Sequence, residues 1–372
     1  MVTLRVIVDS VVEARPRGVA RYAEELTRGL VATAPRDCDV EGIAAAASDG
    51  EVAQLHERIP GLAGLHKTAL GRRELYAAWQ HGVTTVPVHG MVHSPTLLAP
   101  LRGHDRAQRP EDQVTVTIHD ATAWNPDTAD ERAGWTRAMA KRARKHADAV
   151  VVPTHAVAAE LAEHLDFGDR IRVIGGAPSL RLPADPDGVA ARLGLPRAYL
   201  VAMASAHPRK RLAALLEALA LPGVPDVPLV LVGVRTAGLD ALLEQSGLGT
   251  TRLHLLEDLT DDELAVVIRG AAAFVLPSAA EGFGLSLLEA FALGTPVIHS
   301  DAPALVEVSD GAGVVVAREP GAAYADRLAD AIVTTLTDVA LLDRLRVRGF
   351  DRAKAFSWTD SAEKVWQLHA DL

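Results

Sequence analysis

Two glutamates stand eight residues apart in the segment EGFGLSLLEA, which runs from Glu281 to Ala290. The apolar run AAFVLPS precedes the segment, and a helical pattern of apolar residues begins after Gly284. We therefore expect Glu281 on a strand-to-helix turn and Glu289 about one turn inside the helix. A fully helical stretch would separate the two acids by roughly 12 Å, which is about the reach from one sugar to another across a pyrophosphate.

Glycines flank the aromatic residue between these acids. Gly282 and Gly284 let the backbone approach a ligand, and the free amides from Gly284 to Leu287 favour an anion. The alternative is an ordinary capped helix whose acids lie near its first turn because of the helix dipole. The segment GTPVIHSD, which follows, weighs against that alternative.

Two cations follow a second apolar run, AYLVAMAS, in the segment HPRK. Arg209 and Lys210 would lie at the carboxyl end of the predicted strand, where they could clamp a pyrophosphate and neutralise the charge of a departing phosphate. The alternative is a pair of solvated loop charges. Gly233 ends another predicted strand where a nucleotide base could lie, although GVRTAG lacks the spacing of a dinucleotide fingerprint.

The first half of the chain offers three further candidates. Gly18 precedes a helical pattern, so it could bring backbone amides to a phosphate or an acceptor, or simply permit a tight turn. His119 and His93 each stand at or near the end of a predicted strand, although isolated histidines are more often structural or solvated.

The elements that must position these residues alternate along the whole chain. Short Val/Ile-rich runs are separated by longer helical patterns, which indicates parallel strands joined by crossover helices. Strands are predicted at 4–9, 39–46, 91–95, 113–120, 148–154 and 170–176, and again at 198–205, 228–234, 252–258, 272–278, 296–301 and 311–317. The predicted fold class is α/β, with two facing Rossmann-like doubly wound parallel-sheet domains and a ligand-binding cleft between them.

Composition sets the domain boundaries and excludes some functions. A proline-rich stretch places a linker at about 181–194, between domains at 1–180 and 195–356, and the final helix, 357–372, is expected to cross back onto the first domain. The 372 residues carry a net charge of −10, which argues against nucleic acid as a partner. Cys38 is the single cysteine, and together with the apparent lack of a signal peptide it favours a reducing cytosol. The basic face from Arg137 to Lys145 is either solvated or rests on an anionic membrane.

The long segment PSAAEGFGLSLLEAFALGTPVIHSDAPALVEV resembles the signature of the retaining glycosyltransferases of family GT4, which have the GT-B fold and a Glu-x7-Glu motif. Further segments resemble the family's first helix, histidine strand, phosphate-binding loop and closing helix: RGVARYAEELTRGL, TIHD, HPRKRLAALLEALA and AKAFSWTDSAEKVWQLH. The resemblance covers nearly the full chain and is weakest between residues 45 and 85.

This resemblance implies roles for individual residues. Glu289 would hold the ribose hydroxyls of a sugar nucleotide, Glu281 would contact hydroxyls of the transferred sugar, and His119 would line the sugar pocket. Many members carry an arginine six residues before the lysine of the phosphate loop; that position is Ala204 here, and Arg209 is expected to compensate. The candidate catalytic residues are Glu281, His119, Arg209 and Lys210, and the candidate donor-binding residues are Gly18, Gly233, Gly282, Phe283, Gly284, Leu285, Glu289 and Glu307.

The implied reaction is transfer of a hexose, with some preference for mannose, from a nucleoside diphosphate sugar to a hydroxyl acceptor with retention of configuration. The acceptor would be a glycan, a lipid-linked molecule or a small metabolite, and no metal or other cofactor is expected. The expected location is the cytoplasm of a bacterium. Peripheral contact with the inner face of the membrane is kept as an alternative. Two alternatives remain: a catalytically inactive subunit that binds a sugar nucleotide or a protein partner, and a sugar-nucleotide 2-epimerase.

Overall fold

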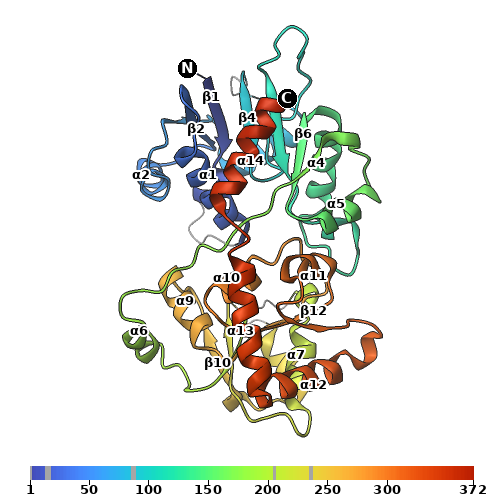
Figure 1. The fold of residues 1–372 in the computed structure, drawn as a ribbon. Helices are drawn as coiled ribbons and strands as arrows, with labels where there is room; N and C mark the ends of the chain where they lie inside the picture. Colours follow the sequence, from blue (N-terminus) through green and yellow to red (C-terminus); the bar gives the residue numbers. More distant parts are fainter. Residues whose placement is uncertain (1, 13–17, 85–88, 204–206, 234–237) are drawn as a thin grey trace. The chain divides into compact units, whose positions relative to one another are not determined.

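The computed structural model describes residues 2–12, 18–84, 89–203, 207–233 and 238–372. The chain divides into two compact units (Figure 1). Unit 1 comprises Met1–Gly176 and Ser357–Leu372, and unit 2 comprises Ala177–Phe356. Each unit is an α/β protein built on a parallel sheet, so the predicted α/β class with two parallel-sheet domains is confirmed.

Unit 1 is built on one parallel sheet. Among its described residues the sheet has seven strands in the order β3-β2-β1-β4-β5-β6-β7. The strands are β1 Val2–Ile7, β2 Cys38–Ala44, β3 Gly64–Lys67, β4 Met91–Ser94, β5 Gln113–Thr117, β6 Ala149–Val152 and β7 Ile171–Val173. The helices are α1 Gly18–Ala32, α2 Asp49–Arg58, α3 Arg72–Gln80, α4 Ala133–His146, α5 His155–Ala162 and α14 Trp358–Asp371. Short 3-10 turns are Asp9–Val12, Thr122–Trp124 and Gly168–Arg170.

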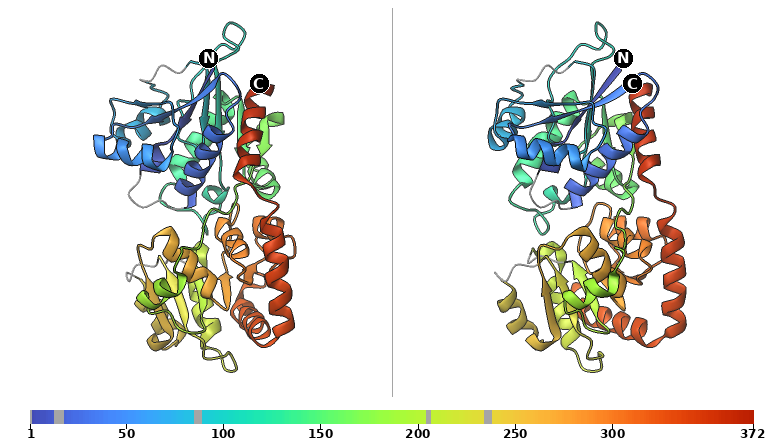
Figure 2. Two further views of the ribbon diagram at one scale, coloured as in Figure 1. Left: turned by 60° about the vertical axis from the view of Figure 1, so that its left-hand side comes forward. Right: turned by 90° about the vertical axis from the view of Figure 1, so that its left-hand side faces the viewer.

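Both faces of this sheet are buried. All four residues of β6 (AVVV) are buried, which is typical of a parallel strand covered on two sides. Val150 and Val152 enter a core with α3, α4 and α5, whereas Ala149 and Val151 enter a second core with α1, α2 and α14. Figure 2 shows helices on both faces.

The last helix, α14, packs against α1. The indole Nε1 of Trp366 donates to the carbonyl of Leu30 at 3.1 Å, and the hydroxyl of Ser361 donates to the carbonyl of Gly175 at 2.9 Å. A Cβ atom on Gly29 would lie 2.9 Å from the carbonyl oxygen of Trp358, so this glycine permits the close approach of the two helices.

Two buried histidines join α14 to the sheet. Nδ1 of His93 lies 2.7 Å from the hydroxyl of Thr115, which lies 3.3 Å from Nε2 of His369. Nδ1 of His369 lies 2.8 Å from Oε1 of Gln113. Burial lowers the pKa of His93 well below its usual value, and the neighbouring His369 adds to this effect. Burial also lowers the pKa of His369 to about 4.

The lowered pKa values of these two histidines predict that the protein loses stability in mild acid. Each is neutral when folded and protonates in the unfolded chain near pH 6.5, so the free energy of unfolding should fall as pH drops from about 6.5 towards 4. The fall approaches about 1.4 kcal/mol per pH unit for each histidine. Urea unfolding of the wild type and of His369→Gln between pH 7.5 and 5 measures this fall in the free energy of unfolding. The variant should show a shallower pH dependence, and equal slopes would contradict the assignment.

Unit 2 repeats the architecture with fewer strands. Its described residues form a sheet of six parallel strands in the order β10-β9-β8-β11-β12-β13. The strands are β8 Leu200–Met203, β9 Leu229–Val232, β10 Leu253–Leu256, β11 Ala273–Leu276, β12 Val297–Ser300 and β13 Val314–Val316. The helices are α6 Pro186–Arg192, α7 Leu212–Ala220, α8 Leu239–Ser246, α9 Asp261–Gly270, α10 Leu285–Ala292, α11 Pro303–Ser309, α12 Tyr324–Thr337 and α13 Val339–Ala353. The 3-10 turns are Pro208–Lys210, Thr250–Arg252 and Gly321–Ala323.

This second sheet is also covered on both faces. Val201 of β8 enters a core that α9 and α10 complete, whereas Leu200 and Ala202 enter a core with α7, α8 and α12. The sheet therefore holds its strand ends rigidly, and the loops that follow the strands are fixed at one edge.

The structure differs from the sequence-based prediction in two places. The edge strand β3 was missed, because GLHK is short and carries no apolar alternation. The stretch 181–194, predicted as a linker, lies within unit 2 and contains α6, whose first turn is capped by Asp185 and begins with Pro186. Among the described residues, no helix is long and apolar enough to cross a membrane.

Candidate active site

The central pair of strands in unit 2 brings two loops together. β8 and β11 are parallel neighbours, so the loops that follow their carboxyl ends lie at the same edge of the sheet. The loop after β8 holds the turn Pro208–Lys210, and the loop after β11 runs to Gly284 at the start of α10. The backbone amide of Ala279 donates to the carbonyl of Arg209 at 2.7 Å and ties the two loops together.

Three predicted catalytic residues meet where these loops join. Nζ of Lys210 donates to Oε1 of Glu281 at 2.5 Å, and Nη1 of Arg209 lies 3.7 Å from Oε2. The side chain of Glu281 is 12% exposed, and those of Lys210 and Arg209 are 23% and 25% exposed. The two cations thus contact the acid, while part of each side chain stays exposed.

The charge on Glu281 is stabilised by these neighbours. Burial on its own would raise the pKa of the carboxyl, but the positive charges of Lys210 and Arg209 outweigh burial, and the net pKa is lowered. Glu281 is therefore an ionised hydrogen-bond acceptor at neutral pH.

Gly284 begins α10 in a conformation that favours glycine. Its φ of 84° and ψ of 48° are left-handed, and a Cβ atom would lie 2.6 Å from Cδ2 of Leu305. Within the described part of the chain, the amides of the next two residues, Leu285 and Ser286, have no hydrogen-bond partner. Gly282 is buried, and Phe283 packs edge-on against Phe356 with ring centroids 5.9 Å apart.

Glu289 lies deeper than its partner acid and makes other contacts. It is 2% exposed, and its carboxylate accepts hydrogen bonds from Ser179 and Leu180. The predicted pair of acids thus comes from one turn and helix, but only Glu281 joins the two cations.

Two further predicted residues of unit 2, Gly233 and Glu307, lie on separate elements. Gly233 follows β9 with a φ of 81°, is exposed, and would place a Cβ atom in open space. Glu307 lies half-buried on α11, and its carbonyl accepts from Arg352 at 3.1 Å. Ala204 lies outside the described residues.

The remaining predicted residues belong to unit 1. Nε2 of His119 lies 2.8 Å from the carbonyl of Pro95, and its ring packs edge-on against Tyr22 with centroids 4.8 Å apart. Burial lowers the pKa of His119, only partly offset by the bond to Pro95 and by Asp120, so the ring is neutral at pH 7. His93 is fully buried within the sheet.

Gly18 is the first residue of α1. It is exposed, a Cβ atom there would meet no atom within 4 Å, and its φ is not positive. The described residues of unit 1 therefore do not demand a glycine at this position.

Two ion pairs at strand ends were not predicted from the sequence. Asp301 follows β12, and Nε of Arg318 donates to its Oδ1 at 2.6 Å, while Nη1 of Arg318 donates to the carbonyl of Ala279 in the loop after β11. In unit 1, Asp9 is separated from the end of β1 only by Val8, is 1% exposed, and its Oδ2 lies 3.0 Å from Nε of Arg72. An acid close after an apolar strand was the available signal in both cases.

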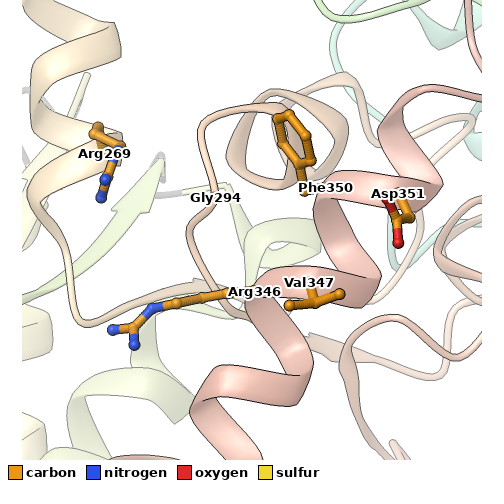
Figure 3. Close-up of a pocket in the computed structure, with 6 residues that line it drawn as sticks. All are labelled: Arg269, Gly294, Arg346, Val347, Phe350 and Asp351. Carbon is orange, nitrogen blue, oxygen red and sulfur yellow. The ribbon is translucent and has the colours of Figure 1, made fainter.

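A cavity of about 530 Å³ opens elsewhere on unit 2 (Figure 3). Its lining includes Gly294, which follows the last turn of α10, so it lies at the opposite end of this helix from Glu281. The other lining residues are Arg269, Arg346, Val347, Phe350 and Asp351. This cavity contains none of the predicted site residues.

Comparisons with known proteins match both units to one family. The model described as "Glycosyltransferase Family 4" matches residues 16–177, and the model described as "Glycosyl transferases group 1" matches residues 191–349. Together the two matches leave only the ends and a short junction uncovered.

Individual relatives match part of the chain. The O-antigen chain mannosyltransferase B of Escherichia coli is 33% identical over 43% of this chain and 42% of its own length. The phosphatidyl-myo-inositol mannosyltransferase of Mycobacterium tuberculosis is 33% identical over 44% of each protein. Less than half of the length of these relatives is therefore matched.

A solved structure matches the whole chain. HepE of Anabaena, in complex with UDP-glucose, has a TM-score of 0.74 at 17% identity and covers 100% of both chains. At this identity the likeness establishes the fold, which is the GT-B fold.

Proposed function

This chain belongs to glycosyltransferase family 4, and from that premise we propose that it transfers a hexose from a nucleoside diphosphate sugar to a hydroxyl acceptor. The observation that supports this proposal best is the meeting of Lys210, Arg209 and Glu281 at one strand edge of unit 2. Two partly exposed cations suit a diphosphate, and an ionised acid beside them suits the hydroxyls of the attached sugar.

The residues of unit 2 would divide the donor between them. Lys210 and Arg209 would bind the diphosphate together with the unpartnered amides of Leu285 and Ser286 at the start of α10. Glu281 would accept hydrogen bonds from the sugar. Glu289 would take the ribose, and the base would lie towards Gly233 and Glu307.

We propose that the reaction proceeds with retention and without a protein nucleophile. The bond from the anomeric carbon to the phosphate oxygen breaks, and the bond to the acceptor oxygen forms on the same face. The acceptor proton passes to the departing phosphate, whose charge Lys210 and Arg209 stabilise. In unit 1, His119 would line the sugar pocket, and the open space at Gly18 would admit the phosphate or the acceptor.

The proposed sugar is mannose, because the two relatives described above are mannosyltransferases. Because HepE was solved in complex with UDP-glucose, UDP-glucose is the second donor to test. For the acceptor we propose a glycan, a glycolipid or a metabolite in the bacterial cytoplasm. Contact with an anionic membrane would involve the exposed cations of α4, which are Arg137, Lys141, Arg144 and Lys145.

The test of this function is product formation. Purified protein is incubated with GDP-mannose or UDP-glucose and a series of hydroxyl acceptors, and products are analysed by mass spectrometry and by NMR of the anomeric proton. A new glycoside with the anomeric configuration of the donor is the expected result. A free epimerised sugar nucleotide, or no turnover despite nucleotide binding, would overturn it in favour of an epimerase or an inactive subunit.

A further inference from the structure

The carboxylate of Glu289 is already occupied by hydrogen-bond donors from the same chain. Oε1 accepts from the amide of Ser179 at 2.9 Å and from its hydroxyl at 3.2 Å, and Oε2 accepts from the amide of Leu180 at 2.9 Å. Because Glu289 is 2% exposed, these bonds replace the water that a buried carboxylate would otherwise need.

The donors lie in what we call the entry segment, residues 177–180, which are the first residues of unit 2 after the chain leaves unit 1. The entry segment forms neither helix nor strand, so its amides have no partner within a regular element. Leu180 is 4% exposed and enters the same hydrophobic core as Leu288 of α10. Glu289 therefore fixes the backbone at the point where the chain enters unit 2.

The acceptor capacity of a carboxylate is limited. Its two oxygens offer about four lone-pair positions, and the entry segment fills three of them. A ribose diol brings two further donors. Glu289 cannot satisfy both hydroxyls of the diol and keep all three bonds to the entry segment.

We propose that Glu289 is a positioning residue shared between two partners: it holds the entry segment when no donor is bound, and the ribose of the donor displaces part of that contact. This inference rests on the proposed function, because it takes a nucleoside diphosphate as the competing ligand. Donor binding would then loosen the backbone that connects unit 2 to unit 1. The hydrogen bond from the hydroxyl of Ser179 would break first, because it is the longest of the three.

Removing that hydroxyl tests the competition directly. Ser179→Ala leaves both amide bonds in place and frees one acceptor position, so the variant should bind the nucleoside diphosphate about threefold more tightly. Ser246→Ala is the matched control, because it removes a serine hydroxyl that donates to a backbone carbonyl on α8 of the same unit, at 3.0 Å. Its affinity should equal that of the wild type. Unchanged or weaker binding by Ser179→Ala would overturn the competition.

Hydrogen exchange of the entry segment gives a second, independent measurement. Without nucleotide the amides of Ser179 and Leu180 should exchange slowly, and saturation with nucleoside diphosphate should speed their exchange about tenfold, whereas ligands normally slow exchange near their sites. Glu289→Gln, which has one acceptor oxygen instead of two, should already exchange faster without nucleotide.

The outcomes separate this inference from the proposed function. One outcome is that the nucleotide binds while exchange of the two amides stays unchanged or slows. In that case Glu289 keeps its hydrogen bonds to the entry segment, and the proposal that the ribose displaces them is wrong, while the proposed function stands. If no nucleoside diphosphate binds at all, the proposed function fails and the sharing fails with it.

Discussion

Replacing Glu281 with glutamine should lower turnover with a sugar nucleotide about 100-fold or more, while affinity for the nucleoside diphosphate alone stays within about threefold of the wild type. Glutamine fills the same space but carries no negative charge. It would hold the sugar hydroxyls weakly, because a charged acceptor makes the stronger hydrogen bond. Diphosphate binding should survive, because Lys210 and Arg209 keep their positive charges and the neutral glutamine no longer offsets them.

Steady-state kinetics and calorimetric titration measure these two effects separately. Glu263→Gln is the matched control: Glu263 is another acid of unit 2, it lies 3.4 Å from Arg192, and glutamine preserves its role in the capping box of α9. That variant should be kinetically normal. Unchanged turnover in Glu281→Gln would show that this acid does not contact the transferred sugar.

Replacing Lys210 with alanine should weaken binding of the nucleoside diphosphate by between about 10- and 150-fold, because one charge-assisted hydrogen bond is worth roughly 1.5–3 kcal/mol. A loss of affinity near the upper end of this range is expected, because the negative charge of Glu281 would then lie near the phosphates with only Arg209 to balance it. The remaining affinity should also depend less on salt, because one screened attraction has been removed.

Calorimetric titrations at two salt concentrations measure this loss. Lys354→Ala is the control, because Lys354 is the residue that follows α13 in the same unit and pairs with Asp351 at 2.9 Å. It should bind like the wild type. Equal affinity of Lys210→Ala and the control would remove Lys210 from the phosphate site.

Sequence patterns predicted the strands of unit 2 and the position of Glu281 well, because both depend on local order along the chain. Buried parallel strands have continuous apolar sequences, and Gly284 immediately precedes the first residue of α10. The pairing of Lys210 with Glu281 was not predicted from the sequence, since 71 residues separate them. It is the neighbouring position of β8 and β11 that brings them together.

The contacts of Glu289 could not be predicted from the sequence. They involve Ser179 and Leu180, in a stretch whose prolines indicate only irregular structure. The hydrogen bond from Arg318 to the carbonyl of Ala279 likewise depends on the order of the sheet, in which β12 pairs with both β11 and β13. Long-range hydrogen bonds to backbone atoms leave no signature in residue types, so these features needed the fold.

Titration of the unmodified protein with GDP, UDP, dTDP and ADP tests the central claim most directly. The account predicts that at least one of these binds at a single site per chain and raises the unfolding temperature in proportion to the logarithm of its concentration. The base that binds then identifies the donor class. If none of them binds, the cations and acid at the edge of the unit 2 sheet are not a sugar-nucleotide site, and the proposed function is wrong.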